Sequence, residues 1–208
     1  MLNRDQLVAV LDKTADKIIA NKQFLSDLDQ VIGDGDHGIN MAKGFGQVKE
    51  KLNSVKDKDC GDIMKMVAMT LISSVGGASG PLYGTAYLKA SAVLKGKMEI
   101  SAEDYIKANQ AAVDGIVMRG KAKEGEKTML DAIIPALREF EAKIKTGATP
   151  AAAIKASYQA AQKGVEYTKT IIATKGRASY MGERSIGHQD PGATSSTLIL
   201  QVLSEELN

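Results

Sequence analysis

The chain has 208 residues, 44% of them hydrophobic and 25% charged, which is the balance of a globular protein and a length that suits one domain over residues 1–208. Its 27 basic residues are offset by 25 acidic ones, acids interrupt the lysine-rich stretches 49–58 and 121–127, and only 4% of residues are aromatic, so we expect no contact with nucleic acid. No apolar stretch approaches the roughly 20 residues of a membrane span, no secretory signal opens the chain and the single cysteine cannot form an internal disulfide, so we expect a cytoplasmic location without membrane contact.

Apolar residues recur at helical spacing along almost the whole chain, as at Leu130, Ile133, Ile134 and Leu137, whereas alternation with period two is hard to find. This pattern predicts an all-α fold in which the clusters of glycine separate the helices. About eight helices are expected, at residues 3–22, 38–53, 60–75, 80–95, 102–119, 128–146, 149–174 and 190–206.

Three of the expected helix starts carry a capping signature. Ser101 precedes an aspartate by three residues, and Thr149 and Asp190 each stand directly before a proline. A side-chain oxygen at such a position can accept a hydrogen bond from a free backbone N–H group, and proline at the first helical position loses no bond. The stretch 63–72 is apolar nearly all round, so we expect it to be buried, with its methionines filling the core.

The first glycine-rich segment, 28–38, reads LDQVIGDGDHG and contains Asp29, Asp34 and Asp36. It includes a literal G-x-G-x-x-G, but a dinucleotide fingerprint needs a preceding strand and a βαβ unit, which a helical chain lacks. Three carboxylates beside a glycine-permitted turn fit a hard divalent cation better. The segment lacks the glycine and the glutamate of a calcium-binding EF-hand, so magnesium is favoured. The alternative, in which Asp34 and Asp36 are ordinary turn and cap residues, stays open on these residues alone.

A second glycine cluster, at 75–85, separates two apolar helices and contains one small hydroxyl residue, Ser79. Free N–H groups and the positive end of a helix would form a phosphate cradle there, although a tight crossing of two packed helices explains the glycines equally well. Residues 115–122 nearly match a Walker A loop, but Ala122 replaces the required Ser or Thr and the pattern around it is helical. We therefore exclude that motif.

The third segment, 175–194, is long for a connection between helices, and such loops in compact domains are usually functional or mobile. Arg177 could contact phosphate, and the N–H groups after Pro191 form a further helix start that favours anions. Both histidines, His37 and His188, lie in the glycine-rich segments rather than on apolar faces, which favours contact with a ligand. Neither has the spacing of a zinc site, and no Ser-His-Asp arrangement can be inferred.

Four segments in this order, LDQVIGDGDHGINM, GGASGPLYGTAYL, GEKTMLDAIIPAL and GRASYMGERSIGHQDPGATSS, together resemble the L subunit, or L domain, of dihydroxyacetone kinases over the whole chain. The resemblance implies a barrel of eight antiparallel helices that holds ADP or ATP at one end. It also implies that Asp29, Asp34 and Asp36 bind two magnesium ions that bridge the nucleotide phosphates. The implied nucleotide pocket consists of His37, Gly38, Ile39, Asn40, Ala78, Ser79, Gly120, Met129, Arg177, Asp190, Pro191 and Gly192. Of these, Gly120 and Met129 rest on the resemblance alone.

The resemblance further implies partner subunits. In these kinases a separate K subunit holds the ketose, dihydroxyacetone, through a covalent link to a histidine, so this chain alone should phosphorylate nothing. A free-standing L subunit is similar to the bacterial form in which bound ADP is rephosphorylated in place by a phosphocarrier M subunit of the phosphotransferase system. The expected chemistry is phosphoryl transfer by positioning and charge neutralisation, with Arg177 as a candidate for stabilising the moving charge. The alternatives are an ATP-exchanging kinase subunit, the ATP-binding domain of a fatty-acid kinase, and a regulatory interaction protein.

Overall fold

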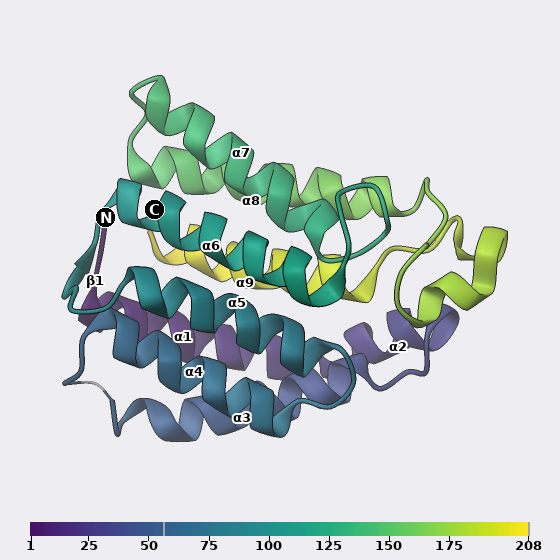
Figure 1. Ribbon diagram of the computed structural model, residues 1–208, viewed down its shortest axis with the longest axis horizontal. Helices are drawn as coiled ribbons and strands as arrows, with labels where there is room; N and C mark the ends of the chain where they lie inside the picture. The colour runs from purple at the N-terminus through teal and green to yellow at the C-terminus, as the bar shows by residue number, and fades with distance from the viewer. Residues whose placement is uncertain (56, 208) are drawn as a thin grey trace.

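The computed structural model describes residues 1–55 and 57–207, and it consists almost entirely of helices (Figure 1). The α-helices are α1 (Arg4–Ala20), α2 (Lys22–Ile32), α3 (His37–Leu52), α4 (Cys60–Ser74), α5 (Ser79–Val93), α6 (Ala102–Gly120), α7 (Leu130–Lys145), α8 (Pro150–Thr168) and α9 (Pro191–Glu206). A 3₁₀ helix, η1 (Arg177–Ser185), lies between α8 and α9. Two short strands, β1 (Leu2–Asn3) and β2 (Glu99–Ile100), pair antiparallel. The expected all-α fold is confirmed.

Eight of the helices in the described part of the chain form a closed barrel. α1 packs against α3, each helix from α3 to α8 packs against the next, and α9 returns to α1. The chain runs back and forth along the barrel, so neighbouring helices are antiparallel, and both termini lie at the same end (Figure 1). The opposite end carries α2, η1 and the connections from α4 to α5 and from α6 to α7. The predicted barrel of eight antiparallel helices is thus present, with α2 as an additional helix at one end.

Large apolar side chains fill most of the barrel. Phe45, Leu71, Ile116 and Phe140 are each at most 2% exposed. Removing a side chain of this size from water stabilises the fold by roughly 1.5–3 kcal/mol. An apolar cavity of about 190 Å³ remains between the helices. No helix in the described residues is long and apolar enough to cross a membrane.

The three predicted helix caps are confirmed. Ser101 Oγ accepts a hydrogen bond from the backbone N–H of Asp104 at 3.1 Å, and Thr149 Oγ1 accepts one from Ala152 at 3.2 Å. Asp190 Oδ2 accepts one from Ala193 at 2.7 Å, and prolines occupy the first position of α8 and α9 as expected. These capped starts fix where three of the barrel helices begin.

Other boundaries differ from the prediction. The helix expected at 3–22 ends at Ala20, because Asn21 leaves the helical conformation with φ −96° and ψ 12°, and α2 follows where no helix was expected. The helix expected at 149–174 ends at Thr168, whose carbonyl accepts a hydrogen bond from the side chain of Lys127. The strand pair was not predicted, because two residues are too few to show alternation.

The prediction that 63–72 is buried all round is wrong in part. This stretch lies in α4, where Ile63, Val67 and Leu71 face the core and are fully buried. Met69 and Ile72, in contrast, are 53% and 41% exposed. The reason is architectural, since each helix in the wall of a barrel has one face turned outward.

Candidate metal centre

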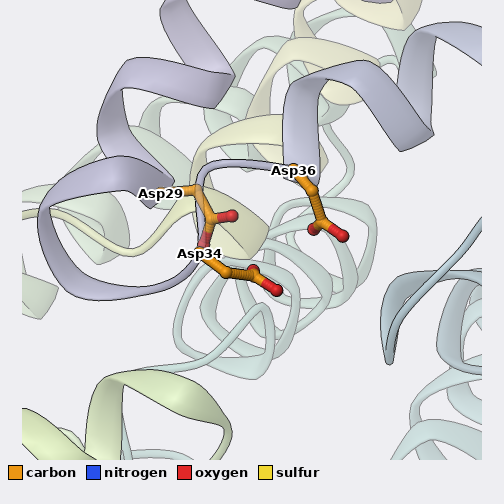
Figure 2. Close-up of side chains that lie close together, drawn as sticks. All are labelled: Asp29, Asp34 and Asp36. Carbon is orange, nitrogen blue, oxygen red and sulfur yellow. The ribbon is translucent and has the colours of Figure 1, made fainter.

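Three carboxylates meet at the end of the barrel that lies away from the chain termini (Figure 2). Asp29 belongs to the last turn of α2, Asp34 to the following turn, and Asp36 directly precedes α3. One oxygen atom of each residue lies within 4.8 Å of the other two. The structure therefore brings together the three aspartates that the sequence singled out.

Two glycines shape the turn between α2 and α3. A Cβ atom at Gly33 would collide with Oδ1 of Asp29, so glycine at this position leaves room for that carboxylate. Gly35 has a φ of +77°, in the left-handed region that glycine adopts at no steric cost. The chain can therefore reverse within 33–36 and bring Asp36 back to Asp29.

The cluster concentrates negative charge. Burial raises the pKa of Asp29 above its usual value, and repulsion from Asp34 and Asp36 adds to the rise. A hydrogen bond from the backbone N–H of His37, 3.1 Å from Asp29 Oδ2, acts in the opposite direction. Two unit charges about 5 Å apart repel by roughly 3 kcal/mol at an effective dielectric constant of 20. A divalent cation would remove this repulsion, and carboxylate oxygens are ligands that suit magnesium.

The alternative, in which the aspartates act only as cap and turn residues, fits the structure less well. Asp36 occupies the N-cap position of α3, yet its side chain accepts no capping hydrogen bond. Asp34 forms an ion pair with Arg177, in which Nε lies 2.8 Å from Oδ2. Neither carboxylate is therefore used to satisfy the start of the helix that follows.

Arg177 reaches the cluster from a distant part of the chain. It is the first residue of η1, and its side chain is 67% exposed. The sequence predicted contact with a phosphate, and in the structure the partner is Asp34. A guanidinium carries five N–H donors, so pairing through Nε leaves donors for an anion bound at the same place. The structure thus places this arginine beside the carboxylates, while its contact with phosphate stays a prediction.

The second predicted cradle lies at the start of α5. Ala78 precedes this helix and supplies no side-chain cap, and an uncapped helix N-terminus attracts anions. The alternative of a tight helix crossing is realised at the same time. A Cβ atom at Gly80 would collide with the carbonyl oxygen of Val75, and one at Gly84 would collide with the side chain of Ile72. The close approach explains the glycines at 80 and 84, while binding of phosphate at the start of α5 stays a prediction.

Several other predicted pocket residues are close neighbours at this end of the barrel. A Cβ atom built on Gly192 would lie 3.0 Å from Oδ2 of Asp190 and 3.5 Å from Cβ of Met129. A Cβ atom built on Gly76 would lie 3.0 Å from Oδ1 of Asn40, so the loop before α5 touches α3. This end of the barrel contains the starts of α3, α5 and α9 and the end of α6, whose last residue is Gly120. Their roles as nucleotide ligands stay predictions.

His37 is buried rather than in a loop. It begins α3 and is 7% exposed, with Nδ1 at 2.9 Å from Oγ of Ser79 and Nε2 at 2.9 Å from Oγ of Ser195. Tyr83 Oη extends the chain of hydrogen bonds, 2.7 Å from Ser195 Oγ. Burial lowers the pKa of His37 to about 4, so the ring is neutral at neutral pH. This network connects the starts of three helices. Sequence reasoning missed Tyr83 and Ser195, although both residues lie within the motifs that carry the family resemblance.

The second histidine, His188, is exposed between η1 and α9.

Asp190 caps α9 from a buried position. Its Oδ2 accepts the hydrogen bond from Ala193, and its own backbone N–H donates to Oγ1 of Thr168 at 3.0 Å. Burial raises the pKa of Asp190 to about 7, and the hydrogen bond from Ala193 opposes the rise. The group can thus bind a proton near neutral pH, which an exposed aspartate does not.

Known proteins resemble this chain in both sequence and fold. The family model of the DAK2 domain matches residues 31–205. The chain is 42% identical over 203 residues to the "PEP-dependent dihydroxyacetone kinase, ADP-binding subunit DhaL" of Escherichia coli (strain K12), covering 98% of this chain and 97% of that protein. It is 43% identical over 205 residues to the "PTS-dependent dihydroxyacetone kinase, ADP-binding subunit DhaL" of Lactococcus lactis subsp. lactis (strain IL1403), covering 99% and 98%.

The fold is similar to that of the dihydroxyacetone kinase of C. freundii. The TM-score is 0.76 for the native form and 0.74 for the complex with AMP-PNP and Mg²⁺. At 23% sequence identity this likeness shows the fold alone. The match covers 96% of this chain and 34% of the native-form chain, so the present chain corresponds to about a third of that protein.

Proposed function

We propose that the chain holds ADP or ATP for phosphoryl transfer to dihydroxyacetone. The premise is that it belongs to the DAK2 domain family and, within it, to the ADP-binding subunits of PEP-dependent dihydroxyacetone kinases. The observation that carries the proposal is the convergence of Asp29, Asp34 and Asp36 at the barrel end where α5 and α9 begin. Carboxylates beside helix N-termini suit a nucleotide whose phosphates are bridged by a cation.

The three aspartates would hold magnesium, with two ions in the proposed arrangement. Bound magnesium neutralises charge on the phosphates and so lowers the barrier to their transfer. The donor set fits this ion, because it consists of carboxylate oxygens close enough to share one centre. The C. freundii dihydroxyacetone kinase, which has the same fold over this region, was crystallised in complex with AMP-PNP and Mg²⁺.

The chain's own groups would bind and orient the nucleotide. The uncapped N–H groups at the start of α5 favour phosphate, and so would the N–H groups at the start of α9 that the Asp190 cap leaves free. Arg177 offers further donors beside Asp34. The buried network around His37 holds the starts of α3, α5 and α9 at fixed spacing. The proposed pocket residues are His37, Gly38, Ile39, Asn40, Ala78, Ser79, Gly120, Met129, Arg177, Asp190, Pro191 and Gly192.

The acceptor and the donor would come from partner proteins. We propose a K subunit that carries dihydroxyacetone and a phosphocarrier M subunit that rephosphorylates ADP in place. Large apolar side chains are exposed around the same barrel end, which supports docking of proteins there. They are Phe24, Val31, Ile39, Ile72, Tyr180 and Ile186, each at least 41% exposed.

Nucleotide retention tests the first part of the proposal. Protein purified without added nucleotide and dialysed against magnesium should retain about one equivalent of ADP, because tightly bound ligand leaves slowly, and EDTA should release it. Asp34→Asn should weaken retention of magnesium and nucleotide together. Nucleotide-free protein that takes up no ADP in the presence of magnesium would contradict the proposal.

An activity assay tests the phosphoryl donor. The chain is mixed with a K subunit and dihydroxyacetone, and phosphoenolpyruvate with carrier proteins is compared with ATP as the only donor. We expect product with phosphoenolpyruvate and the carriers, and little with ATP. Product formed from ATP alone at the same rate would favour an ATP-exchanging subunit.

A further inference from the structure

Lys127 is a buried lysine in the connection between α6 and α7. Its side chain is 1% exposed, and it is the one lysine among the described residues that is buried. Its backbone has a φ of +59°, a region that non-glycine residues rarely adopt. Removing an ammonium group from water is costly unless its donors are satisfied. A buried charge on a strained backbone needs a compensating contact elsewhere in the fold.

The ammonium group of Lys127 donates to three backbone carbonyls. Nζ lies 2.5 Å from the oxygen of Thr168, 2.7 Å from that of Ser185 and 3.3 Å from that of Ile171. An ammonium has three N–H donors, so these contacts use all of them. Its lowered pKa comes from burial, which the more distant carboxylates of Asp190 and Asp131 oppose.

These carbonyls lie at the two ends of one loop. Thr168 is the last residue of α8 and Ser185 the last of η1, so one side chain bonds to both ends of the segment 169–190. Ser185 Oγ also accepts a hydrogen bond from the backbone of Ala173 at 2.9 Å, and the backbone N–H of Gly187 donates to the carbonyl of Lys169 at 2.7 Å. The loop is therefore closed at its base by buried polar contacts.

The tip of this loop carries Arg177 to the carboxylate cluster. Its ion pair with Asp34 is largely exposed, and exposed ion pairs contribute little to stability. Holding a loop of this length in one conformation costs conformational entropy for every residue ordered. The pair at the tip cannot offset that cost by itself. Thr174 and Lys175 add a backbone hydrogen bond and a long ion pair with Glu126, and the fully buried contacts of the loop are those at its base.

We propose that Lys127 is a positioning residue, which anchors the loop 169–190 so that Arg177 stays beside the carboxylate cluster. The role of Arg177 toward a nucleotide rests on the proposed function, whereas the anchoring of the loop does not. Lys127 acts on the bound phosphates only through Arg177, because its own donors are all used by the protein backbone.

Hydrogen exchange of the nucleotide-free protein tests the anchor. Lys127→Met keeps an unbranched side chain, one atom shorter, and removes the charge and the donors. We expect the amides of Ala173 and Gly187 to exchange roughly tenfold faster in this variant, because their acceptors lie in the loop that Lys127 holds. Lys121→Met is the matched control, since Lys121 is exposed and also has a left-handed backbone, with φ +48°. Equal exchange in the loop of Lys127→Met and of the parent would overturn the proposal.

A second variant covers the case in which Lys127→Met does not fold. Ser185→Ala retains the lysine and removes only the hydroxyl, which accepts from Ala173 and donates to the carbonyl of Gly182. The same amides should then exchange faster by about threefold, a smaller effect because the two hydrogen bonds that are lost join neutral groups. If Lys127→Met does not fold and the amides of Ala173 and Gly187 exchange at the same rate in Ser185→Ala as in the parent, that result would also count against an anchored loop.

A double-mutant cycle tests whether Lys127 acts through Arg177. Release of ADP in magnesium is measured for the parent, Lys127→Met, Arg177→Ala and the double variant. Each single variant should release ADP roughly tenfold faster, and the double variant no faster than the faster single one, because both changes remove the same contact. Effects that multiply would show that Lys127 acts independently of Arg177 and would overturn the positioning role.

The two tests separate this inference from the proposed function. If the parent protein binds no ADP, the proposed function is wrong and no nucleotide-positioning role remains for Lys127. The exchange measurement then still decides whether Lys127 anchors the loop. If ADP binds but Lys127→Met leaves both exchange and release unchanged, the proposed function stands and the inference fails.

Discussion

Asp36→Asn should change stability in opposite directions with and without magnesium. Asparagine has the same shape as aspartate, and Asp36 provides no capping hydrogen bond, so the substitution removes little except charge. That charge lies within 4.8 Å of Asp29 and Asp34. At this distance, unit charges repel by about 0.9 kcal/mol in water and about 3.5 kcal/mol at an effective dielectric constant of 20.

The lower of these energies applies to a cluster that is open to solvent. Asp34, for example, has a side chain 35% exposed. Relief of two repulsions should therefore stabilise Asp36→Asn by about 1–2 kcal/mol in EDTA. With magnesium and ADP at 100 times the dissociation constant of the parent, binding raises the free energy of unfolding of the parent by about 2.7 kcal/mol. If Asp36→Asn binds the ligand a hundredfold more weakly, binding raises its free energy of unfolding by only about 0.4 kcal/mol. The variant should then be the less stable protein in magnesium and ADP.

Thermal unfolding followed by circular dichroism measures both effects. For a chain of this size, 1 kcal/mol shifts the melting temperature by about 2–4 °C. Asp27→Asn is the matched control, because Asp27 is exposed on the same helix, α2, and does not belong to the cluster. The reasoning is refuted if Asp36→Asn melts below the parent in EDTA, or if it gains as much from magnesium and ADP as the parent does.

Two further predictions concern other residues of this site. Gly33→Ala should abolish most of the magnesium-dependent gain in melting temperature, because the added methyl group collides with Asp29, whereas Gly46→Ala, which has open space around it, should not. Asp190→Asn should remove a pH dependence measured by denaturant unfolding in EDTA. The pKa of Asp190 is raised to about 7 in the folded protein. Protonated Asp190 therefore adds to the free energy of unfolding below about pH 4, and this contribution falls as the pH rises to 7, by at most about 1.4 kcal/mol per pH unit. His37, with a pKa lowered to about 4, makes the free energy of unfolding rise between pH 4 and 6.5, so the pH dependence of the variant must be compared with that of the parent. The same pH dependence in both proteins would contradict the assignment.

The acidic turn could be predicted from the sequence because the information that forms it is local. Asp29, Asp34 and Asp36 fall within eight residues, and the glycines between them permit the sharp reversal that groups the carboxylates. The helix starts at Ser101, Thr149 and Asp190 were predictable for the same reason, since a cap and its partner are three residues apart. Gly120 and Met129, in contrast, could be proposed only from the family resemblance.

The residues that sequence reasoning missed depend on contacts between distant parts of the chain. Lys127 stands in a run of charged residues and looks exposed, yet its carbonyl partners lie 41 to 58 positions further along. His37 looked like a loop residue, but Ser195, 158 positions away, helps to bury it. No local pattern encodes the burial of Lys127 and His37. The additional helix α2, in contrast, was missed although Leu25, Leu28 and Ile32 recur at helical spacing.

The closed ring of helices has a consequence for the order in which the site can form. Each contact from α3 to α9 joins neighbours in sequence and can form early, but the contact between α1 and α9 spans nearly the whole chain. The acidic turn follows α2, whereas Ser195, the partner of His37, lies in α9. During synthesis the carboxylates are therefore made long before the helix that completes their surroundings. The ability to bind a ligand should appear in a single late step, when the last helix of the ring docks.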